Sequence, residues 1–492
     1  MSKITHVDIR MYKMGTGDCF TLKFYADVEV RYKMMIDCGT WSGGTQYLTD
    51  YIVELKKDME DHIDLLVVTH EHKDHVHVFD ACKDLLKPES FTVDRTWMAW
   101  TEEDSKQNIK EWQAKYGDKK KSLAIAAGKL QNALNDPSYK AHMEKEFKGI
   151  NLLASRQDYA NIISEFAALQ MDINSATGDY IGPLAGMKMV KDTISKGKID
   201  YFKPGKIINN IPKLDGITFY VLGPPESCEE VKLETGGEGE SYSHNKELAE
   251  GRAFSSAILA MSGETSENVL PFDKAYEAKA ATGIPNAAYN RSGDEWRKID
   301  NDWLSSAGSL SLRMNSMTNN LSLALAIEFE DSGRVMLFPG DAEFGSWASW
   351  HKIPWSVPSR KKNLHFTHDL LDRTVFYKVA HHLSHHGTAE KQGLKMMTSP
   401  DLVSMATLDY NIIAPRWTGT MPNIPLLKDL LPATKGRLMI MNTDKLLYNR
   451  KEKITLADQI EQERRRMTAA EAAEFNRYFK NEKHYIQYTV KG

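Results

Sequence analysis

Cysteine is scarce in this chain. Four of the 492 residues are cysteines, Cys19, Cys38, Cys82 and Cys228, and no two of them have the C-x-x-C spacing. We therefore expect reduced thiols, as in a cytoplasmic protein. Cys19 and Cys38 nevertheless stand close in sequence to two of the motifs described below, so they are expected near the candidate site.

The chain also lacks the apolar segments of membrane and exported proteins. It has no run of about 18 apolar residues, so we expect no membrane-spanning helix and no membrane partner. Residues Met1–Arg10 alternate in the manner of a β-strand and contain no apolar signal core. The sequence therefore predicts a cytoplasmic location.

An excess of charge of one sign is missing as well. The formal net charge is −4, which argues against a generally basic nucleic-acid binder but leaves room for a local basic groove. Apolar residues make up 41% of the chain, enough for a large packed core. A length of 492 residues is long for one domain, so we expect insertions or an appended domain.

The most informative segment that is present is Thr69–His75, with the sequence THEHKDH. It directly follows the apolar run Ile63–Val68, whose β-branched residues are typical of a buried parallel strand. Strand ends of this kind carry the sites of α/β proteins. Histidine nitrogens mixed with a carboxylate suit zinc, manganese or iron. The alternative is a solvated, histidine-rich loop, but the position after a buried strand favours a metal site.

Five further motifs lie at the ends of expected strands in a consistent order: Met14–Phe20, Met34–Thr40, Asn319–Leu325, Val335–Glu343 and Tyr377–His386. Met14–Phe20 leads into a strand, and Asn319–Leu325 is itself expected to be a strand. Together with THEHKDH, this pattern resembles the metallo-β-lactamase superfamily. The branch that it resembles most is the ComEC-like one, which includes the hydrolase domain of bacterial DNA-uptake proteins and stand-alone relatives. That branch carries Gly-x-Gly-Asp early and Lys-Val-x-His-His-x-Ser late.

The resemblance implies an α/β fold of four layers, αββα. The catalytic domain would comprise residues 1–101 and 197–442. A change in sequence texture predicts a helical insertion at 102–196, and a second insertion of loops and short helices is expected at 226–317. Residues 443–492 are expected to add a C-terminal helix and strand.

The resemblance also implies metal ligands. They are His70 and His72 for a first metal, Asp74 and His75 for a second, Asp341 as a bridge, and one residue of the pair His381 and His382. We favour His381 of this pair, because it comes first beyond the expected strand. The expected cofactor is one or two divalent ions, zinc or manganese.

Other residues are expected to support or complete the chemistry. Asp74 would orient or deprotonate the attacking water, and His385 would protonate a leaving group or contact a phosphate. Asp37 is expected to hold a ligand imidazole in one tautomer. Asp18 could give similar support or could fix a turn. An exposed loop histidine is the alternative for His385.

The chain departs from the superfamily pattern in three places. No histidine marks the usual third ligand position of the first metal, where only His142 and His244 are found, both within the insertions. Val76–Val78 replaces a common glycine pair, and Leu383 replaces the glycine of His-His-Gly-Ser. The first metal is therefore expected to be weakly held or absent.

The predicted function is a metal-dependent hydrolase that uses a metal-bound hydroxide, with a phosphodiester or nucleic acid as substrate. One rival hypothesis is hydrolysis of a small ester, lactone or amide. A rival of another class is a metal-binding regulatory or effector component of a bacterial multi-gene system, such as a defence system, with a protein partner bound through the insertions. The sequence leaves the oligomeric state open.

Overall fold

The computed structural model describes most of the chain in two compact units. The described residues are 2–41, 43–135, 152–173, 180–233, 236–237, 240–242, 314–384, 386–411, 421–449 and 451–492. The first unit comprises Met1–Asp104, Leu184–Glu247 and Ser316–Gly492, and the second comprises Ser105–Pro183 and Leu248–Asn315. His142, His244 and His385 lie outside the described residues, as does most of the second predicted insertion.

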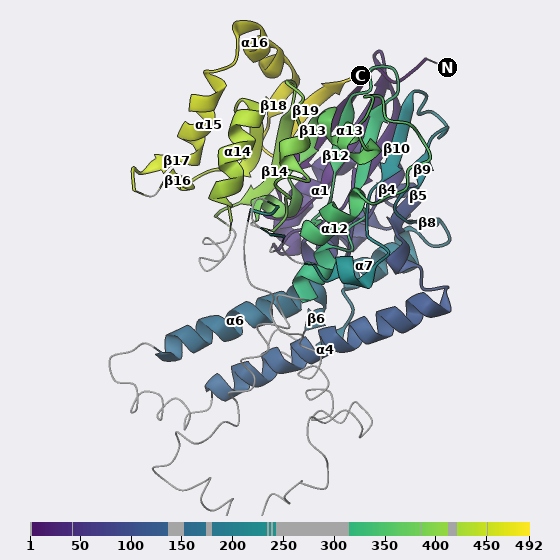
Figure 1. The fold of residues 1–492 in the computed structure, drawn as a ribbon. Helices are drawn as coiled ribbons and strands as arrows, with labels where there is room; N and C mark the ends of the chain where they lie inside the picture. The colour runs from purple at the N-terminus through teal and green to yellow at the C-terminus, as the bar shows by residue number, and fades with distance from the viewer. Residues whose placement is uncertain are drawn as a thin grey trace, which may run out of the picture. The chain divides into compact units, whose positions relative to one another are not determined.

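The first unit contains a mixed sheet of eight strands (Figure 1). Its order is β18 (Phe479–Asn481), β19 (Tyr485–Lys491), β1 (His6–Tyr12), β2 (Phe20–Ala26), β3 (Glu29–Ile36), β4 (His62–Val67), β5 (Thr92–Ala99) and β8 (Ile199–Phe202). Strand β4 runs parallel to both β3 and β5, so the buried parallel strand expected before THEHKDH is confirmed.

A second sheet of seven strands belongs to the same unit. Its order is β15 (Leu438–Asn442), β14 (Val403–Asp409), β13 (Thr374–Lys378), β12 (Val335–Phe338), β11 (Leu325–Phe329), β10 (Ile217–Val221) and β9 (Ile207–Ile208). Strands β12 to β15 run parallel to one another, so their carboxyl ends meet at one edge of the sheet.

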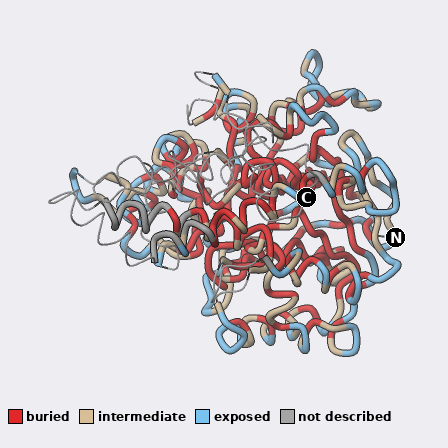
Figure 2. The backbone as a smooth tube through the Cα atoms, turned by 90° about the horizontal axis from the view of Figure 1, so that it is seen from below, coloured by how far each residue is buried: buried red, intermediate tan, exposed pale blue. Residues whose placement is uncertain are grey.

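The two sheets pack face to face around one apolar core, to which β2, β4, β12 and β13 all contribute buried side chains. The rings of Phe20 and Phe338 meet across this interface with centroids 6.0 Å apart. Figure 2 shows the buried stretches of the chain gathered in the interior and the exposed ones at the periphery. Burial of an aliphatic or aromatic side chain contributes about 1.5–3 kcal/mol, so this interface is a large source of stability.

Helices cover the outer face of each sheet. The first sheet carries α1 (Thr45–Met59), α2 (Lys73–Ala81), α3 (Lys83–Leu86) and α7 (Ala185–Met189). The second carries α12 (Phe344–Trp350), α13 (Phe366–Asp372), α14 (Ile424–Thr434) and α15 (Leu456–Arg464). The expected α/β fold of four layers is therefore confirmed. None of the helices among the described residues is long and apolar enough to cross a membrane.

Amphipathic spacing explains why α1 forms and where it packs. Its buried residues are Leu48, Ile52, Leu55 and Met59, which share one face of the helix. Glu60 ends the helix in the left-handed conformation, and its backbone N–H returns to the last carbonyls. The helix thus covers the strands that lead to the candidate site.

The second unit is built largely from two long helices. These are α4 (Gln107–Asn135) and α6 (Leu152–Gln170), which pack against each other, and a small hairpin of β6 (Asp172–Ile173) and β7 (Tyr180–Gly182) accompanies them. The unit begins at Ser105 and its first segment ends at Pro183, whereas the sequence placed the helical insertion at 102–196. The difference arises because α7 packs its buried Met187 into the core beneath the first sheet.

Two other segments differ from their sequence interpretation. Residues 314–319 are helical and β11 begins at Leu325, so the strand expected over Asn319–Leu325 is wrong for all but its last residue. The C-terminal segment supplies two helices, α15 and α16 (Ala469–Tyr478), where one was expected, and it supplies the expected final strand, β19. That strand pairs along the whole of β1, from His6 opposite Lys491 to Tyr12 opposite Tyr485, so the chain end is built into the first sheet.

Candidate metal centre

Four polar side chains converge where strands of both sheets end. Asp74 and His75 lie in the first turn of α2, just beyond β4. Asp341 follows β12, and His382 follows β13. Each ligand thus leaves the carboxyl end of a parallel strand, the position that α/β folds use for sites.

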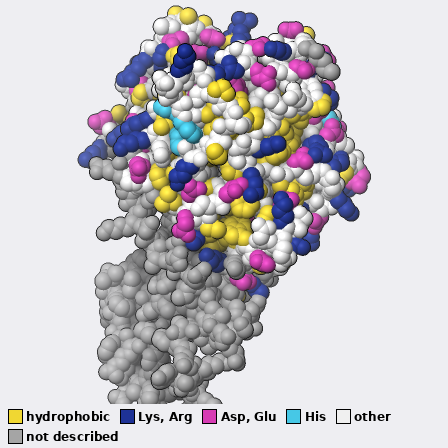
Figure 3. Space-filling view, turned by 45° about the vertical axis from the view of Figure 1, so that its right-hand side comes forward, with side chains coloured by type: hydrophobic (Ala, Val, Ile, Leu, Met, Phe, Trp, Pro, Cys, Tyr) yellow, Lys and Arg dark blue, Asp and Glu magenta, His cyan; other side chains and the backbone are white. Residues whose placement is uncertain are grey.

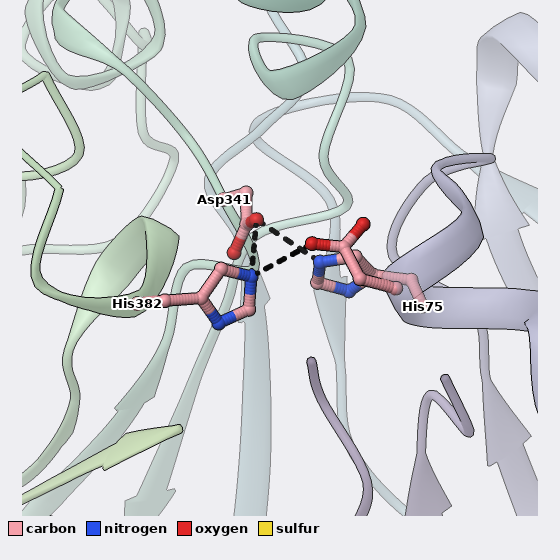
Figure 4. Close-up of side chains that lie close together, drawn as sticks. His75, Asp341 and His382 are labelled. Atoms are coloured by element: carbon pink, nitrogen blue, oxygen red, sulfur yellow. Dashed lines mark hydrogen bonds and ion pairs between the residues drawn. The ribbon is translucent and has the colours of Figure 1, made fainter. Parts of the chain in front are cut away.

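Each of these four residues places one ligand atom within 4.8 Å of the others, and Figure 4 labels His75, Asp341 and His382 among them. Nε2 of His75 and Nε2 of His382 are each 3.0 Å from Oδ2 of Asp341. Nε2 of His382 is also 3.1 Å from Oδ2 of Asp74. The four side chains are between 0% and 4% exposed. Two imidazoles and two carboxylates at this spacing form a donor set that suits a divalent ion.

Asp37 fixes the orientation of His75. Its Oδ2 lies 2.7 Å from Nδ1 of His75, and it accepts further hydrogen bonds from the backbone N–H and the hydroxyl of Thr69 at 2.7 and 2.6 Å. With Nδ1 engaged by a carboxylate, Nε2 is the nitrogen that faces Asp341. The structure thus places Asp37 as the sequence analysis expects.

The electrostatics of the cluster favour positive charge at its centre. Burial alone lowers the pKa of His382, but the carboxylates of Asp341, Asp74 and Asp18 outweigh it and raise that pKa to about 9. The pKa of His75 is likewise raised well above its ordinary value by Asp341 and Asp37, against the effect of burial. A proton or a metal ion can supply the positive charge that these carboxylates attract.

Asp74 offers one oxygen that no group among the described residues satisfies. Its Oδ2 accepts a hydrogen bond from Nε1 of Trp41 at 2.6 Å, whereas its buried Oδ1 has no hydrogen-bond partner in the described part of the chain. A buried carboxylate oxygen without a donor is costly unless a cation binds it. This oxygen, and the four converging donor atoms, fit the divalent ion that the sequence analysis expects.

Lys378 is a cation already built into the centre. Its Nζ lies 2.8 Å from the carbonyl oxygen of Gly340, 3.0 Å from Oδ1 of Asp341 and 2.5 Å from Oδ2 of Asp18. Its side chain is 1% exposed, and the two carboxylates hold its pKa above the ordinary value although burial opposes them. Oδ1 of Asp341 is therefore engaged by the protein, and Oδ2 is the oxygen that faces the histidines.

The structure brings His382 into the cluster in place of His381, which the sequence analysis favours as the last ligand. Nδ1 of His381 instead lies 3.3 Å from Oε1 of Glu343. The strand β13 ends at Lys378, and three successive residues, from His381 to Leu383, then take left-handed backbone conformations. This turn reverses which of the two rings faces the cluster.

Glu343 is a buried acid that the sequence analysis does not single out. Burial opposes its charge, but its contacts to His381 and the hydroxyl of Ser316 lower its pKa to about 2. Nδ2 of Asn319 donates a further hydrogen bond to Oε1 at 2.7 Å. Glu343 therefore holds the His381 ring beside the cluster.

His70 and His72 form a separate pair. Nε2 of His70 lies 3.1 Å from Nδ1 of His72, and both residues are buried. Nδ1 of His70 lies 3.1 Å from the hydroxyl of Thr69 and 3.3 Å from that of Ser322. Among the described residues neither imidazole joins the group formed by Asp74, His75, Asp341 and His382. The expected first metal position thus retains two histidines placed side by side.

The ligand segment is held by a close backbone approach. The N–H of Cys38 donates to the carbonyl of His75 at 2.9 Å, and that of Asp18 donates to the carbonyl of Asp74 at 2.9 Å. A Cβ added at Gly39 would lie 2.2 Å from the carbonyl carbon of Asp74 and from the nitrogen of His75. Gly39 therefore permits the turn after β3 to touch the backbone of α2.

Several residues that position the site were missed by the sequence analysis, namely Trp41, Ser316, Lys378 and Thr407. Lys378 was quoted only as part of a motif, and Thr407 lies in β14, which carries no motif. Nδ1 of His382 lies 2.7 Å from the hydroxyl oxygen of Thr407. The only sequence signal for Thr407 is that it is a polar residue within the buried strand β14.

Comparison with known proteins gives one match. The model of the metallo-beta-lactamase superfamily matches residues 29–149, a segment that contains β3, β4, Asp74 and His75. No curated protein and no solved structure is significantly similar to the chain. Asp341 and His382 lie outside the matched segment, so their convergence on Asp74 and His75 is independent support for a metal centre.

Proposed function

We propose that the protein is a metal-dependent hydrolase of phosphodiesters. The observation that carries this proposal is the convergence of His75, His382, Asp74 and Asp341, whose ligand atoms all lie within 4.8 Å of one another. Both imidazoles are engaged at Nδ1, so both present Nε2 to carboxylate oxygens. Similarity to the metallo-beta-lactamase superfamily over residues 29–149 supports the hydrolase class.

A bound ion and the protein's own side chains would have different roles in hydrolysis. When bound, a divalent ion supplies a Lewis acid and an activated water. The two histidines and Asp341 would hold it, while Trp41 holds Oδ2 of Asp74. Oδ1 of Asp74, which has no partner among the described residues, would then be free to ligate the ion or to accept a proton from water. His385 remains the predicted proton donor to the leaving group.

The distribution of surface charge bears on the substrate. On the face drawn in Figure 3, Lys and Arg side chains are interspersed with Asp and Glu over the described surface. Tight binding of long duplexes depends on neutralising many phosphates with clustered cations. We therefore propose a short or single-stranded phosphodiester as substrate, ahead of a long duplex.

A second candidate is the hydrolysis of a small ester, lactone or amide. The observation that favours it is the burial of the centre, because the four ligand side chains are no more than 4% exposed. A buried centre suits a substrate that is enclosed on most sides. The regulatory or effector role stays a hypothesis that rests on the resemblance alone.

One experiment separates these functions. Purified protein is loaded in turn with Mn²⁺, Zn²⁺ or Mg²⁺ and assayed with bis-p-nitrophenyl phosphate, single-stranded DNA, duplex DNA, RNA and a panel of small esters, lactones and amides. We expect turnover of the phosphodiesters, and its loss in Asp74→Ala and His75→Ala with unchanged circular dichroism. Turnover of the small esters alone would favour the second candidate. Full activity in the Asp74→Ala, His75→Ala double variant would contradict a metallohydrolase.

A further inference from the structure

A chain of hydrogen bonds leaves the candidate centre through His382 and returns to it through Asp341. Nδ1 of His382 lies 2.7 Å from the hydroxyl oxygen of Thr407, which donates to Oδ1 of Asp18 at 2.7 Å. Oδ2 of Asp18 lies 2.5 Å from Nζ of Lys378, which lies 3.0 Å from Oδ1 of Asp341. All five residues are buried.

The donors and acceptors in this chain fix one direction for its protons. The carboxylate of Asp18 can only accept, so the Thr407 hydroxyl must donate to it. The hydroxyl oxygen then has a lone pair left for Nδ1–H of His382. This arrangement fixes the tautomer of His382 and leaves Nε2 toward Asp341 and Asp74.

Lys378 closes the loop at its other end. It bonds to Asp18 through one carboxylate oxygen, while Thr407 bonds to the other. It also engages Oδ1 of Asp341, which directs Oδ2 of that carboxylate toward the two histidines. Any change that rotates Asp18 therefore disturbs both His382 and Asp341.

We propose that Thr407 is a positioning residue for the metal centre. It holds the ring of His382 directly, and it is held in turn by Asp18, which Lys378 fixes. This inference rests on the metal-dependent function proposed above. It parallels the support of His75 by Asp37, with a hydroxyl in place of a carboxylate as the group that accepts Nδ1–H. Partners of this kind tune metal affinity without touching the ion.

A buried threonine with a purely structural role looks different in the same unit. The hydroxyl of Thr434, fully buried in α14, donates to the carbonyl oxygens of Leu430 and Leu431 at 2.9 and 3.2 Å. Both of these carbonyl groups belong to its own helix. The hydroxyl of Thr407 instead joins an imidazole to the carboxylate of Asp18, which lies 389 residues from Thr407 in the sequence. Thr434 is therefore a matched control.

The test compares Thr407→Val, Thr407→Ser and Thr434→Val in the full-length protein. Zn²⁺ affinity is measured by calorimetry, and the ligand geometry is read from the visible absorption of the Co²⁺-loaded protein. We expect Thr407→Val to weaken affinity by about 10–100-fold and to change the Co²⁺ spectrum. Thr407→Ser keeps the hydroxyl and should restore both. Thr434→Val should lose stability but bind Zn²⁺ as the wild type does.

A second variant serves if Thr407→Val does not fold. Asp18→Asn replaces one carboxylate oxygen by an NH2 group, which only donates, so either Thr407 or Lys378 then faces a donor in place of its acceptor. The loop is then broken at one end, and Zn²⁺ affinity should again fall by about 10–100-fold. Wild-type affinity in Asp18→Asn would contradict the inference.

The outcomes separate this inference from the proposed function. Wild-type protein that takes up neither Zn²⁺ nor Co²⁺ would overturn the metal-dependent function. Wild-type protein that binds Zn²⁺, with Thr407→Val equal to it in affinity and Co²⁺ spectrum, would overturn the positioning role alone. Loss of affinity in Thr407→Ser as large as in Thr407→Val would show that packing, and not the hydroxyl, matters at this position.

Discussion

The indole Nε1 of Trp41 donates a hydrogen bond to Oδ2 of Asp74 at 2.6 Å, so an aromatic residue beyond β3 orients a candidate metal ligand. The same oxygen lies 3.1 Å from Nε2 of His382. Because Oδ2 is held in this way, Oδ1 is the oxygen left to meet an ion or a water. Trp41 therefore fixes which carboxylate oxygen of Asp74 faces the centre.

Replacement of Trp41 by phenylalanine should weaken metal binding. The ring is largely kept, but the N–H that orients Asp74 is lost, and we expect a fall in Zn²⁺ affinity of about 10–100-fold. Calorimetric titration measures it. Trp355→Phe is the matched control, because Nε1 of Trp355 donates to the hydroxyl of Thr367 at 3.0 Å, outside the centre. Equal Zn²⁺ affinities for the two variants would show that the indole bond to Asp74 has no role.

The paired histidines after β13 should differ in their effect on metal content. His382→Ala removes one of four converging ligands and should abolish tight binding of an ion. His381→Ala should keep the ion, because Nδ1 of His381 faces Glu343 at 3.3 Å. Metal analysis of the purified variants, together with their circular dichroism, decides between them. Loss of the ion from His381→Ala with retention in His382→Ala would restore the original preference for His381.

Two metal positions, if both are used, should differ in affinity. One position is formed by the four converging residues. The other would be formed by His70 and His72, with a carboxylate oxygen of Asp341 as a candidate third ligand. We expect one ion to stay bound through dialysis and a second to be lost and then restored by added Mn²⁺ or Zn²⁺. Calorimetric titration counts the sites. Two equally tight sites would require a further ligand, and His244, outside the described residues, is the first candidate.

A substitution at Gly39 should damage the centre without removing a ligand. The alanine Cβ would lie 2.2 Å from the backbone of Asp74 and His75, so α2 would have to move. We expect Gly39→Ala to cost at least about 1–3 kcal/mol of stability and to lower Zn²⁺ affinity. Denaturant unfolding and calorimetry measure the two effects. Gly44→Ala, where an added Cβ meets nothing within 4 Å, should change stability by about 1 kcal/mol or less and leave affinity unchanged.

The sequence around a single strand end was sufficient to predict the site residues that directly follow that strand. The apolar run before THEHKDH predicted β4, and a motif after another strand predicted that Asp37 would support an imidazole. Both depend on short segments whose strand periodicity and ligand chemistry are visible in sequence. Asp341 came from the resemblance, whose Gly-Asp motif follows an apolar strand.

The remaining parts depend on geometry that sequence spacing does not encode. The choice of His382 over His381 follows from three consecutive left-handed residues, which a count from the strand end cannot foresee. Trp41 lies 33 residues before Asp74, and Thr407 lies 25 residues after His382, so neither contact follows from a local spacing. The two contacts depend instead on which strands are neighbours, because β3 pairs with β4 and β13 pairs with β14.

Each sheet contributes two of the four converging residues, Asp74 and His75 from one and Asp341 and His382 from the other. An ion bound to all four residues would therefore cross-link the two sheets. Neither sheet alone has more than half of the ligands, so an incompletely assembled chain cannot build the centre. Tight metal uptake would thus require that both sheets are assembled.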